Sequence, residues 1–309
     1  MLTIEPMFGL CNRMQALEAA LALARALDRR LTVIWNLNPE LNCRFEDLFV
    51  MPPGINSLQQ PRRRGLKYYS GPSVRIGTTE RPRTSSPQIA ATGPLSTLAL
   101  RGLRGVNRWL LADRRHDRAI YETEIIRMTE ADFDFDTLRE CPSVFIRAFT
   151  RFYVDRSLAS HLRPTAAIDE QVRQQVALFS EPMVGVHIRR TDNRSSVGVS
   201  TTEHFVANMR DEVARQPLSR FFLSTDDPAE EAVLRRAFPG RILSRPKRTL
   251  DRNEPAAIQD ALVDLYCLSH TGRVLGSFGS SFSRVAARLG GRELVVVGAS
   301  DFNIPSSRP

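Results

Sequence analysis

Short runs of strand-forming residues alternate along this chain with segments in which apolar residues recur every three or four positions. Near the amino terminus, Leu2–Ile4 and Leu31–Trp35 flank a segment with five apolar residues on one helical face: Met14, Leu17, Leu21, Ala24 and Leu27. This order predicts a strand, a helix and a second strand in a parallel βαβ unit. Asn12 precedes the helical pattern, where it either caps the helix or lies in a turn that approaches an anion.

The second half of the chain repeats the alternation more clearly. Apolar runs stand at 183–186, 221–223, 242–243, 273–275 and 294–297, with helical patterns at 166–179, 200–216, 228–240, 258–268 and 282–289. Short apolar runs between polar segments are typical of buried strands in a parallel sheet. Ser200 and Glu203 have the spacing of a capping box and predict the start of a helix. We therefore expect an α/β fold with one domain at 1–163 and another at 164–309, divided at Arg163-Pro164.

Part of the first half lacks this regularity. Residues 52–105 are rich in Pro, Gly, Ser, Thr and Arg, which predicts a long loop that is a lid, an acceptor-binding segment or partly disordered. Residues 101–118 combine arginines with apolar residues at helical spacing, which favours a docked surface helix with at most peripheral membrane contact. Asp132–Asp136 reads DFDFD and resembles a divalent-metal cluster, but the alternation favours a segment with one buried side, so we expect no metal site.

The charge distribution narrows the functional classes. The net charge of +9 arises from 43 basic against 34 acidic residues, and Lys67 and Lys247 are the only lysines. The arginines are spread from end to end and not clustered beside aromatic platforms, which argues against nucleic-acid binding. A positive field still favours anionic substrates.

The cysteines and the amino terminus bear on the compartment. The four cysteines are far apart and form no metal-binding pair, so we expect free thiols in a reducing environment. The first ten residues lack the pattern of a secretory signal, and we expect no membrane span. These features predict a cytoplasmic protein.

Polar residues follow three of the predicted strands in the second half: His187, Arg189 and Arg190 after the first, Asp226 and Asp227 after the second, and Ser277, Ser280 and Ser281 in the loop 276–281. Because the carboxyl ends of parallel strands meet at one edge of a sheet, these groups should face a common crevice. Adjacent arginines there predict an anionic ligand, since guanidinium groups bind phosphate through paired hydrogen bonds. The alternatives are structural ion pairs for the arginines and helix capping before Pro228 for the aspartates.

Two common nucleotide-binding motifs are absent from the sequence. It contains neither the Gly-Lys-Ser/Thr signature of a P-loop nor a Gly-x-Gly-x-x-Gly after a strand. The motifs therefore exclude a P-loop ATPase and a simple dehydrogenase.

Three segments resemble the donor-site motifs of α1,6-fucosyltransferases: HIRRTDN at 187–193, STDDP at 224–228 and QDALVDLYCLSHTGRVLGSFGSSFSRVA at 259–286. This family includes nodulation-factor and core fucosyltransferases, with protein O-fucosyltransferases as more distant relatives. The resemblance covers residues 164–300 and, in the first half, FGLCNR at 8–13 with the helix and strand that follow. It implies a GT-B fold, in which two Rossmann-like domains face each other across a cleft and the second domain holds most of GDP-fucose.

The resemblance also implies individual roles: Arg189 and Arg190 as the catalytic arginine pair, with Arg189 on the β-phosphate; His187, Asp226 and Asp227 as donor-binding residues; Asp264 on the guanine; Ser280 on the phosphate; and Asn12 as a weaker match to an asparagine of the protein O-fucosyltransferases. The chemistry agrees, because an aspartate accepts paired hydrogen bonds from guanine. A fixed guanidinium stabilises the charge that gathers on a departing diphosphate.

One departure from the family concerns the general base. The family's α1,6 enzymes place a glutamate shortly after the arginine motif, whereas here the carboxylate-free segment 194–202 precedes Glu203. Asp192 or Glu203 replaces that glutamate, or the acceptor needs little base assistance. We predict inverting transfer of fucose from GDP-fucose to a glycan or glycoconjugate, without metal or cofactor. The alternatives are a GT-B transferase with another nucleotide sugar, a metal-dependent transferase, and a non-catalytic binder of anionic polymers.

Overall fold

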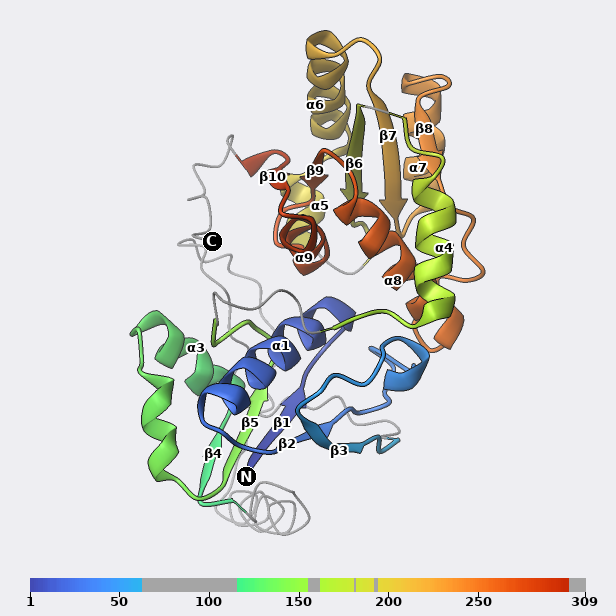
Figure 1. Cartoon of the computed structure of the whole chain (residues 1–309). Helices are drawn as coiled ribbons and strands as arrows, with labels where there is room; N and C mark the ends of the chain where they lie inside the picture. The colour runs from blue at the N-terminus through green and yellow to red at the C-terminus, as the bar shows by residue number, and fades with distance from the viewer. Residues whose placement is uncertain (63–115, 155–161, 181, 192–193, 300–309) are drawn as a thin grey trace, which may run out of the picture.

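The computed structural model describes residues 1–62, 116–154, 162–180, 182–191 and 194–299. These residues form two α/β units, each built on a five-stranded sheet (Figure 1). Every pair of neighbouring strands in both sheets is parallel. The predicted α/β class with two parallel sheets is confirmed.

The sheet of the first unit has the strand order β3-β2-β1-β5-β4. Its strands are β1 (Leu2–Pro6), β2 (Leu31–Ile34), β3 (Ile55–Gln59), β4 (Arg118–Ile120) and β5 (Val144–Ala148). Its helices are α1 (Leu10–Ala26), α3 (Glu122–Glu130) and the 3-10 turns η1 (Phe45–Asp47) and η3 (Phe135–Glu140). The order reverses between β1 and β5, so the crevice of this unit lies beyond the ends of those two strands.

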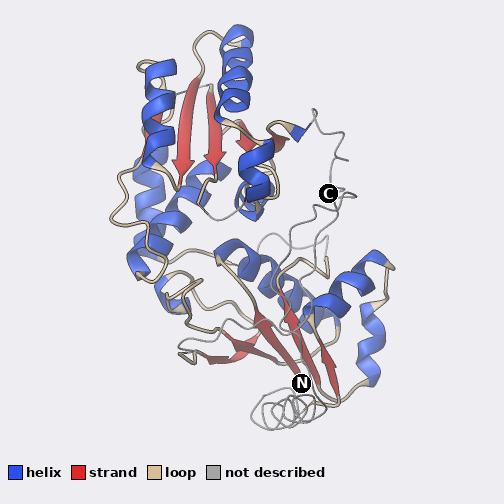
Figure 2. Cartoon of the chain, turned by 180° about the vertical axis from the view of Figure 1, so that it is seen from behind, coloured by secondary structure: helices blue, strands red, loops and turns tan. Residues whose placement is uncertain are grey.

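The sheet of the second unit has the order β10-β9-β6-β7-β8, the arrangement of a Rossmann fold. Its strands are β6 (Met183–Ile188), β7 (Arg220–Thr225), β8 (Ile242–Ser244), β9 (Arg273–Gly276) and β10 (Glu293–Val296). Its helices are α4 (Ala166–Val176), α5 (Arg194–Val199), α6 (Thr202–Arg215), α7 (Pro228–Ala237), α8 (Pro255–Ser269) and α9 (Ser281–Gly290), several of which flank the strands in Figure 2. The order reverses between β6 and β9.

The two units pack against each other through α1 and α9. Helix α1 is rich in alanine and leucine on all sides and is buried along most of its length, because it lies between its own sheet and α9. Glu18 of α1, 4% exposed at its side chain, forms an ion pair with Arg288 of α9. The chain passes between the units near residue 164, where Val50 donates to the carbonyl of Arg163 at 3.0 Å.

A buried ion pair joins β1 to β5 in the first unit. The Nη2 atom of Arg147 lies 2.7 Å from Oε2 of Glu5, and both side chains are less than 5% exposed. Glu5 also accepts from Nδ2 of Asn36 at 2.7 Å, which ties the end of β2 to the same carboxylate. The two charges compensate each other in a buried region, so the loss of either one leaves the other without that compensating charge.

Several predicted boundaries are wrong. Helix α1 begins at Leu10 with Gly9 at the N-cap, so Asn12 lies inside the first turn and caps nothing. The cap of α6 is Thr201, whose hydroxyl accepts from the amide of His204, and the Ser200 hydroxyl instead donates to the carbonyl of Val297 at 2.6 Å. In both places a polar residue near a helix start suggested the cap, but tertiary contacts selected another position.

Parts of the irregular region also differ from expectation. Strand β3 lies within the loop predicted at 52–105, and the remainder of that loop from 63 onwards is outside the described residues. Most of the helix predicted at 101–118 is outside them as well, and Arg118 begins β4. The DFDFD segment does not bury one regular side, because Phe135 is 5% exposed and Phe133 is 37% exposed. Asp134 caps η3 there by accepting from the amide of Asp136.

Candidate active site

A cavity of about 400 Å³ lies between the two units. The first unit contributes the turn Phe8–Asn12 and Glu40; the second contributes His187, Arg189, residues 224–226, Lys247, Thr249, Leu250, Arg252, Ala257, Ile258, Ala261, Asp264, Ser281 and Phe282. The second unit supplies the ends of β6 and β7, the loop before α8, one face of α8 and the start of α9. The cavity thus lies where the strand order of the second sheet reverses, as expected for a ligand site in a Rossmann-like unit.

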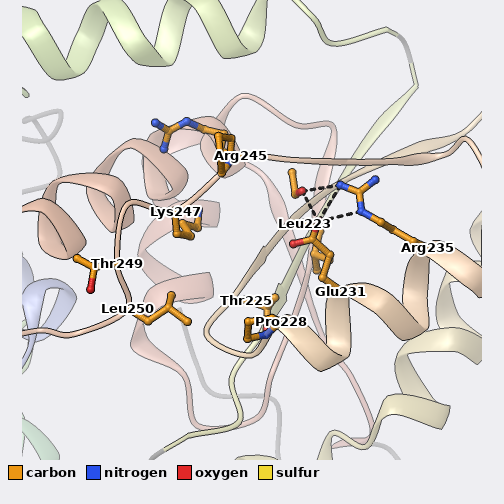
Figure 3. Close-up of a pocket in the computed structure, with 11 residues that line it drawn as sticks. Leu223, Thr225, Pro228, Glu231, Arg235, Arg245, Lys247, Thr249 and Leu250 are labelled. Carbon is orange, nitrogen blue, oxygen red and sulfur yellow. Dashed lines mark hydrogen bonds and ion pairs between the residues drawn. The ribbon is translucent and has the colours of Figure 1, made fainter.

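A second cavity of about 490 Å³ adjoins the first (Figure 3). The two cavities share Thr225, Lys247, Thr249 and Leu250. One side of the second cavity is formed by an ion pair in which Nη2 of Arg235 lies 2.7 Å from Oε1 of Glu231. Lys247 therefore lies at the border between the two cavities.

Arg189 follows β6 and lines the interdomain cavity. Its backbone amide donates to Oγ of Ser277 at 3.0 Å, and the amide of Ser277 donates to the carbonyl of His187 at 3.2 Å. These bonds join the ends of β6 and β9 at the switch point. Ser277 is 2% exposed and does not line the cavity, and the structure shows it in this joining position.

Arg190 is not part of the lining of the cavity that Arg189 lines. Its Nε atom lies 2.5 Å from Oε1 of Glu230, and its Nη1 atom donates to the carbonyl of Ser200 at 2.8 Å. Its guanidinium also lies over the ring of Phe205, 5.9 Å from the centroid. Arg190 thus joins the chain after β6 to α7 and α6, as in the structural ion-pair alternative, and its role in catalysis stays a prediction.

His187 is a buried, neutral side chain in the cavity wall. It is 7% exposed, its ring stacks on Phe282 with centroids 4.6 Å apart, and Nδ1 lies 3.5 Å from Oγ of Ser280. Burial lowers the pKa of His187 to about 3, and the positive charge of Arg189 lowers it further than Asp226 restores it. The imidazole is thus a neutral hydrogen-bonding group beside Arg189.

The pKa of His187 makes the stability of the protein depend on pH. Because the folded pKa of about 3 lies below the ordinary 6.5, the unfolded chain binds more protons between these values. Stability should therefore be complete above pH 6.5 and fall as the pH is lowered, by up to about 1.4 kcal/mol per pH unit. Urea unfolding at pH 7 and pH 5 should show this dependence weakened in His187→Gln and retained in His270→Gln, which alters an exposed histidine. An unchanged dependence in His187→Gln contradicts the assignment.

The two aspartates after β7 divide their roles. Asp226 lines the cavity and accepts from the amide of Arg190 at 2.8 Å and the hydroxyl of Thr191 at 2.6 Å, so it shapes the backbone after β6. Asp227 is the N-cap of α7 and accepts from the amide of Ala229 at 2.8 Å. The capping alternative is thus correct for Asp227, which lies outside the cavity lining.

Asp264 lines the cavity but is already engaged by two cations. Its Oδ1 atom lies 3.2 Å from Nη1 of Arg245, and its Oδ2 atom contacts Nζ of Lys247. The predicted contact with guanine therefore requires that a ligand displace one of these partners or bind beside them.

Two helices begin at the cavity. Ser280 caps α9 by accepting from the amide of Phe282 at 3.2 Å, and Ser281 opens the helix at the cavity wall. Across the cavity, α1 begins at Leu10 after a Gly9 cap that makes no side-chain hydrogen bond, and Asn12 lies in its first turn. Helix starts present free amides and positive dipole ends, which favour an anion between them.

The close approach of α9 to the sheet depends on Gly276 at the end of β9. A Cβ atom there would lie 2.5 Å from the side chain of Ser283. This glycine therefore allows the first turn of α9 to approach the switch point.

Several cavity residues were not predicted from the sequence: Phe8, Glu40, Lys247, Arg252 and Phe282. The second cation of Asp264, Arg245, was missed as well. Lys247 had a weak signal as one of two lysines in the chain, whereas Glu40 had none, because it belongs to a loop of the other unit.

Among the residues that the structure describes, no group of three His, Cys, Asp or Glu side chains lies close enough to hold a metal ion, and Asp132–Asp136 forms no such group. Within the same ranges, no helix combines the length and apolarity needed to cross a bilayer.

The two parallel, Rossmann-like units and the cavity between them define a GT-B fold, as predicted. The structure of the NodZ α-1,6-fucosyltransferase soaked with GDP-fucose is similar to this chain with a TM-score of 0.56 and 13% identity, over 93% of this chain and 92% of that one. NodZ from Bradyrhizobium gives a TM-score of 0.53 with 14% identity over 92% of each chain. POFUT1 in complex with GDP-fucose gives 0.50 with 14% identity over 96% of this chain and 98% of that one.

The comparisons by sequence found no match. No protein-family model matches the sequence. No curated protein matches it either. At 13–14% identity, the solved structures establish the shared fold, and the chemistry must be argued from the residues in the cavity.

Proposed function

We propose that this protein transfers fucose from GDP-fucose to a hydroxyl group of a glycan or glycoconjugate, with inversion and without a metal ion or cofactor. The observation that carries the proposal is the position of Arg189 at the end of β6, in a cavity where α1 and α9 both begin. Its guanidinium and the two helix starts concentrate positive charge at one place. This is the environment that a leaving nucleoside diphosphate requires.

The catalytic contribution of this environment follows from charge development. When the bond between the sugar and the β-phosphate breaks, negative charge builds up on the phosphate oxygens. Fixed donors in the cavity bind that charge more strongly in the transition state than in the ground state, which lowers the barrier. Diphosphate binding by the second unit leaves the first unit to present the acceptor from the opposite side. Direct displacement from that side inverts the anomeric centre.

The choice of GDP is supported by the fold and by the motifs. Structures with the same fold were obtained for NodZ with GDP and with GDP-fucose. The resemblance assigns Asp264 to the guanine, and this carboxylate lines the cavity. Recognition of guanine N1–H by Asp264 would shift Lys247 or Arg245 from one carboxylate oxygen, and the freed cation could donate to the acceptor O6 of the same base.

Nucleotide-dependent melting tests the donor class. GDP at a hundred times its Kd should stabilise the protein by about 2.7 kcal/mol, which raises Tm by several degrees, whereas UDP and ADP at equal concentration should have less effect. A larger shift with UDP or ADP would favour a GT-B transferase with another nucleotide sugar.

Full transfer activity in EDTA is expected, and its loss would favour the metal-dependent alternative.

The remaining alternative, a non-catalytic binder of anionic polymers, makes a different prediction in the same assay. It requires salt-sensitive, sequence-blind polymer binding and no effect of GDP on Tm.

We also propose that the protein is located in the cytoplasm, which its four free cysteines support.

A further inference from the structure

The cavity contains three carboxylates, and two of them have structural partners. Asp226 accepts from the backbone and side chain of Thr191, and Asp264 contacts Arg245 and Lys247. The third is Glu40, the only acidic residue that the first unit adds to the cavity lining as described. Within the described ranges, no ion pair or side-chain hydrogen bond engages the carboxylate of Glu40. It thus has both oxygen atoms available to a ligand.

The backbone around Glu40 is fixed by a buried arginine. The Oδ1 atom of Asn38 accepts from the amides of Glu40 and Leu41, each at 3.1 Å, and Nη2 of Arg13 donates to the same oxygen at 3.0 Å. Arg13 is fully buried, and its Nε atom donates to the carbonyl of Phe8 at 2.7 Å. One guanidinium therefore joins the loop of Glu40 to the turn that starts α1.

Phe8 shows that this wall is constrained. Its φ of 65° lies in the left-handed region, which is costly for a residue with a side chain, and its ring meets that of Phe149 edge-to-face with centroids 4.9 Å apart. Phe8 and Glu40 both line the cavity on the first unit's side. The first unit's side of the cavity thus combines an aromatic side chain with a carboxylate, which suits a sugar hydroxyl better than a phosphate.

The general bases considered from the sequence do not occupy this position. Glu203 lies outside the cavity lining, in the first turn of α6. Hydrogen bonds from its own backbone amide and from Thr201 hold the pKa of Glu203 below its ordinary value, which weakens it as a base. Asp192 lies outside the described residues.

We infer that Glu40 is the general base that activates the acceptor, an inference that rests on the proposed function. Its carboxylate takes the proton from the acceptor hydroxyl as that oxygen bonds to the anomeric carbon of fucose. The bond between this carbon and the β-phosphate oxygen breaks, and GDP leaves with the electron pair. The proton on Glu40 then passes to solvent, to which the residue is exposed. Arg13 acts as a positioning residue through Asn38.

Azide rescue tests this role without knowledge of the acceptor. With water as acceptor, Glu40→Gln should lower kcat for GDP-fucose hydrolysis by about a hundredfold, the lower range for a general base, and leave KM within about threefold of wild type. Azide needs no deprotonation before attack. Sodium azide should therefore restore consumption of GDP-fucose in Glu40→Gln and yield fucosyl azide of inverted configuration.

Matched variants separate this inference from the function on which it rests. Glu46→Gln alters a nearby glutamate that pairs with Arg44 and Gln60 and should hydrolyse GDP-fucose as wild type does. Wild-type hydrolysis in Glu40→Gln, or a defect that azide does not repair, overturns the role of Glu40 and leaves the donor assignment intact. If the wild-type protein neither binds GDP nor consumes GDP-fucose, the proposed function fails and this inference fails with it.

Discussion

Replacement of Arg189 by alanine should lower the turnover of GDP-fucose by about a hundredfold or more, equivalent to about 3 kcal/mol in the barrier. Arg189 lines the cavity at the end of β6. The hydrogen bond from its backbone amide to Ser277 fixes the backbone position from which its side chain extends. Its removal takes away a donor that meets the leaving diphosphate as charge develops. Steady-state hydrolysis or transfer from GDP-fucose measures the effect.

Two variants control for that experiment. Arg189→Lys retains the charge but loses the planar pair of donors, so it should recover only part of the lost activity. Arg210→Ala removes an exposed arginine from α6, outside the cavity lining, and should behave as wild type. Wild-type turnover in Arg189→Ala would remove the proposed mechanism.

Replacement of Arg147 by methionine should destabilise the protein by about 3–5 kcal/mol, because it removes the positive charge that compensates the buried carboxylate of Glu5. The pair joins β1 to β5 at the switch point of the first sheet, so the turn beside the cavity depends on it. Urea unfolding followed by circular dichroism measures the change, provided that the transition is two-state.

The double variant Glu5→Gln with Arg147→Met should recover part of this loss, since it removes the uncompensated charge and keeps an acceptor for Asn36. Arg173→Met removes an arginine that pairs with Asp169 and Glu170 on the surface of α4, and should cost less than about 1 kcal/mol. If Arg147→Met lowers the free energy of unfolding no more than Arg173→Met does, the buried pair does not contribute the stability assigned to it.

Local pattern was sufficient to predict most of the second unit. The apolar runs ahead of His187 and Ser224 became β6 and β7, and the helical pattern predicted from residue 228 became α7. Strand β3 was missed because its residues alternate little in polarity and are at most partly buried. Pairing with β2, and not its own pattern, makes INSLQ a strand.

The site was predictable where one chain segment contains both the strand end and the functional side chain. His187 and Arg189 are such a case. The sequence could not separate Arg189 from Arg190, because the distinction depends on Glu230, forty positions away, which binds only the second guanidinium. Nor could it place Glu40 in the cavity, since that position follows from the packing of two units.

The binding of GDP and GMP to wild type and Arg189→Ala tests the central claim most directly. GMP lacks the β-phosphate that Arg189 is proposed to hold, so wild type should bind GDP more tightly than GMP, by about 1.5–3 kcal/mol for a charged contact. In Arg189→Ala, calorimetry should show this preference largely abolished, with the affinity for GMP unchanged. An equal preference for GDP in both proteins would contradict the placement of the β-phosphate on Arg189.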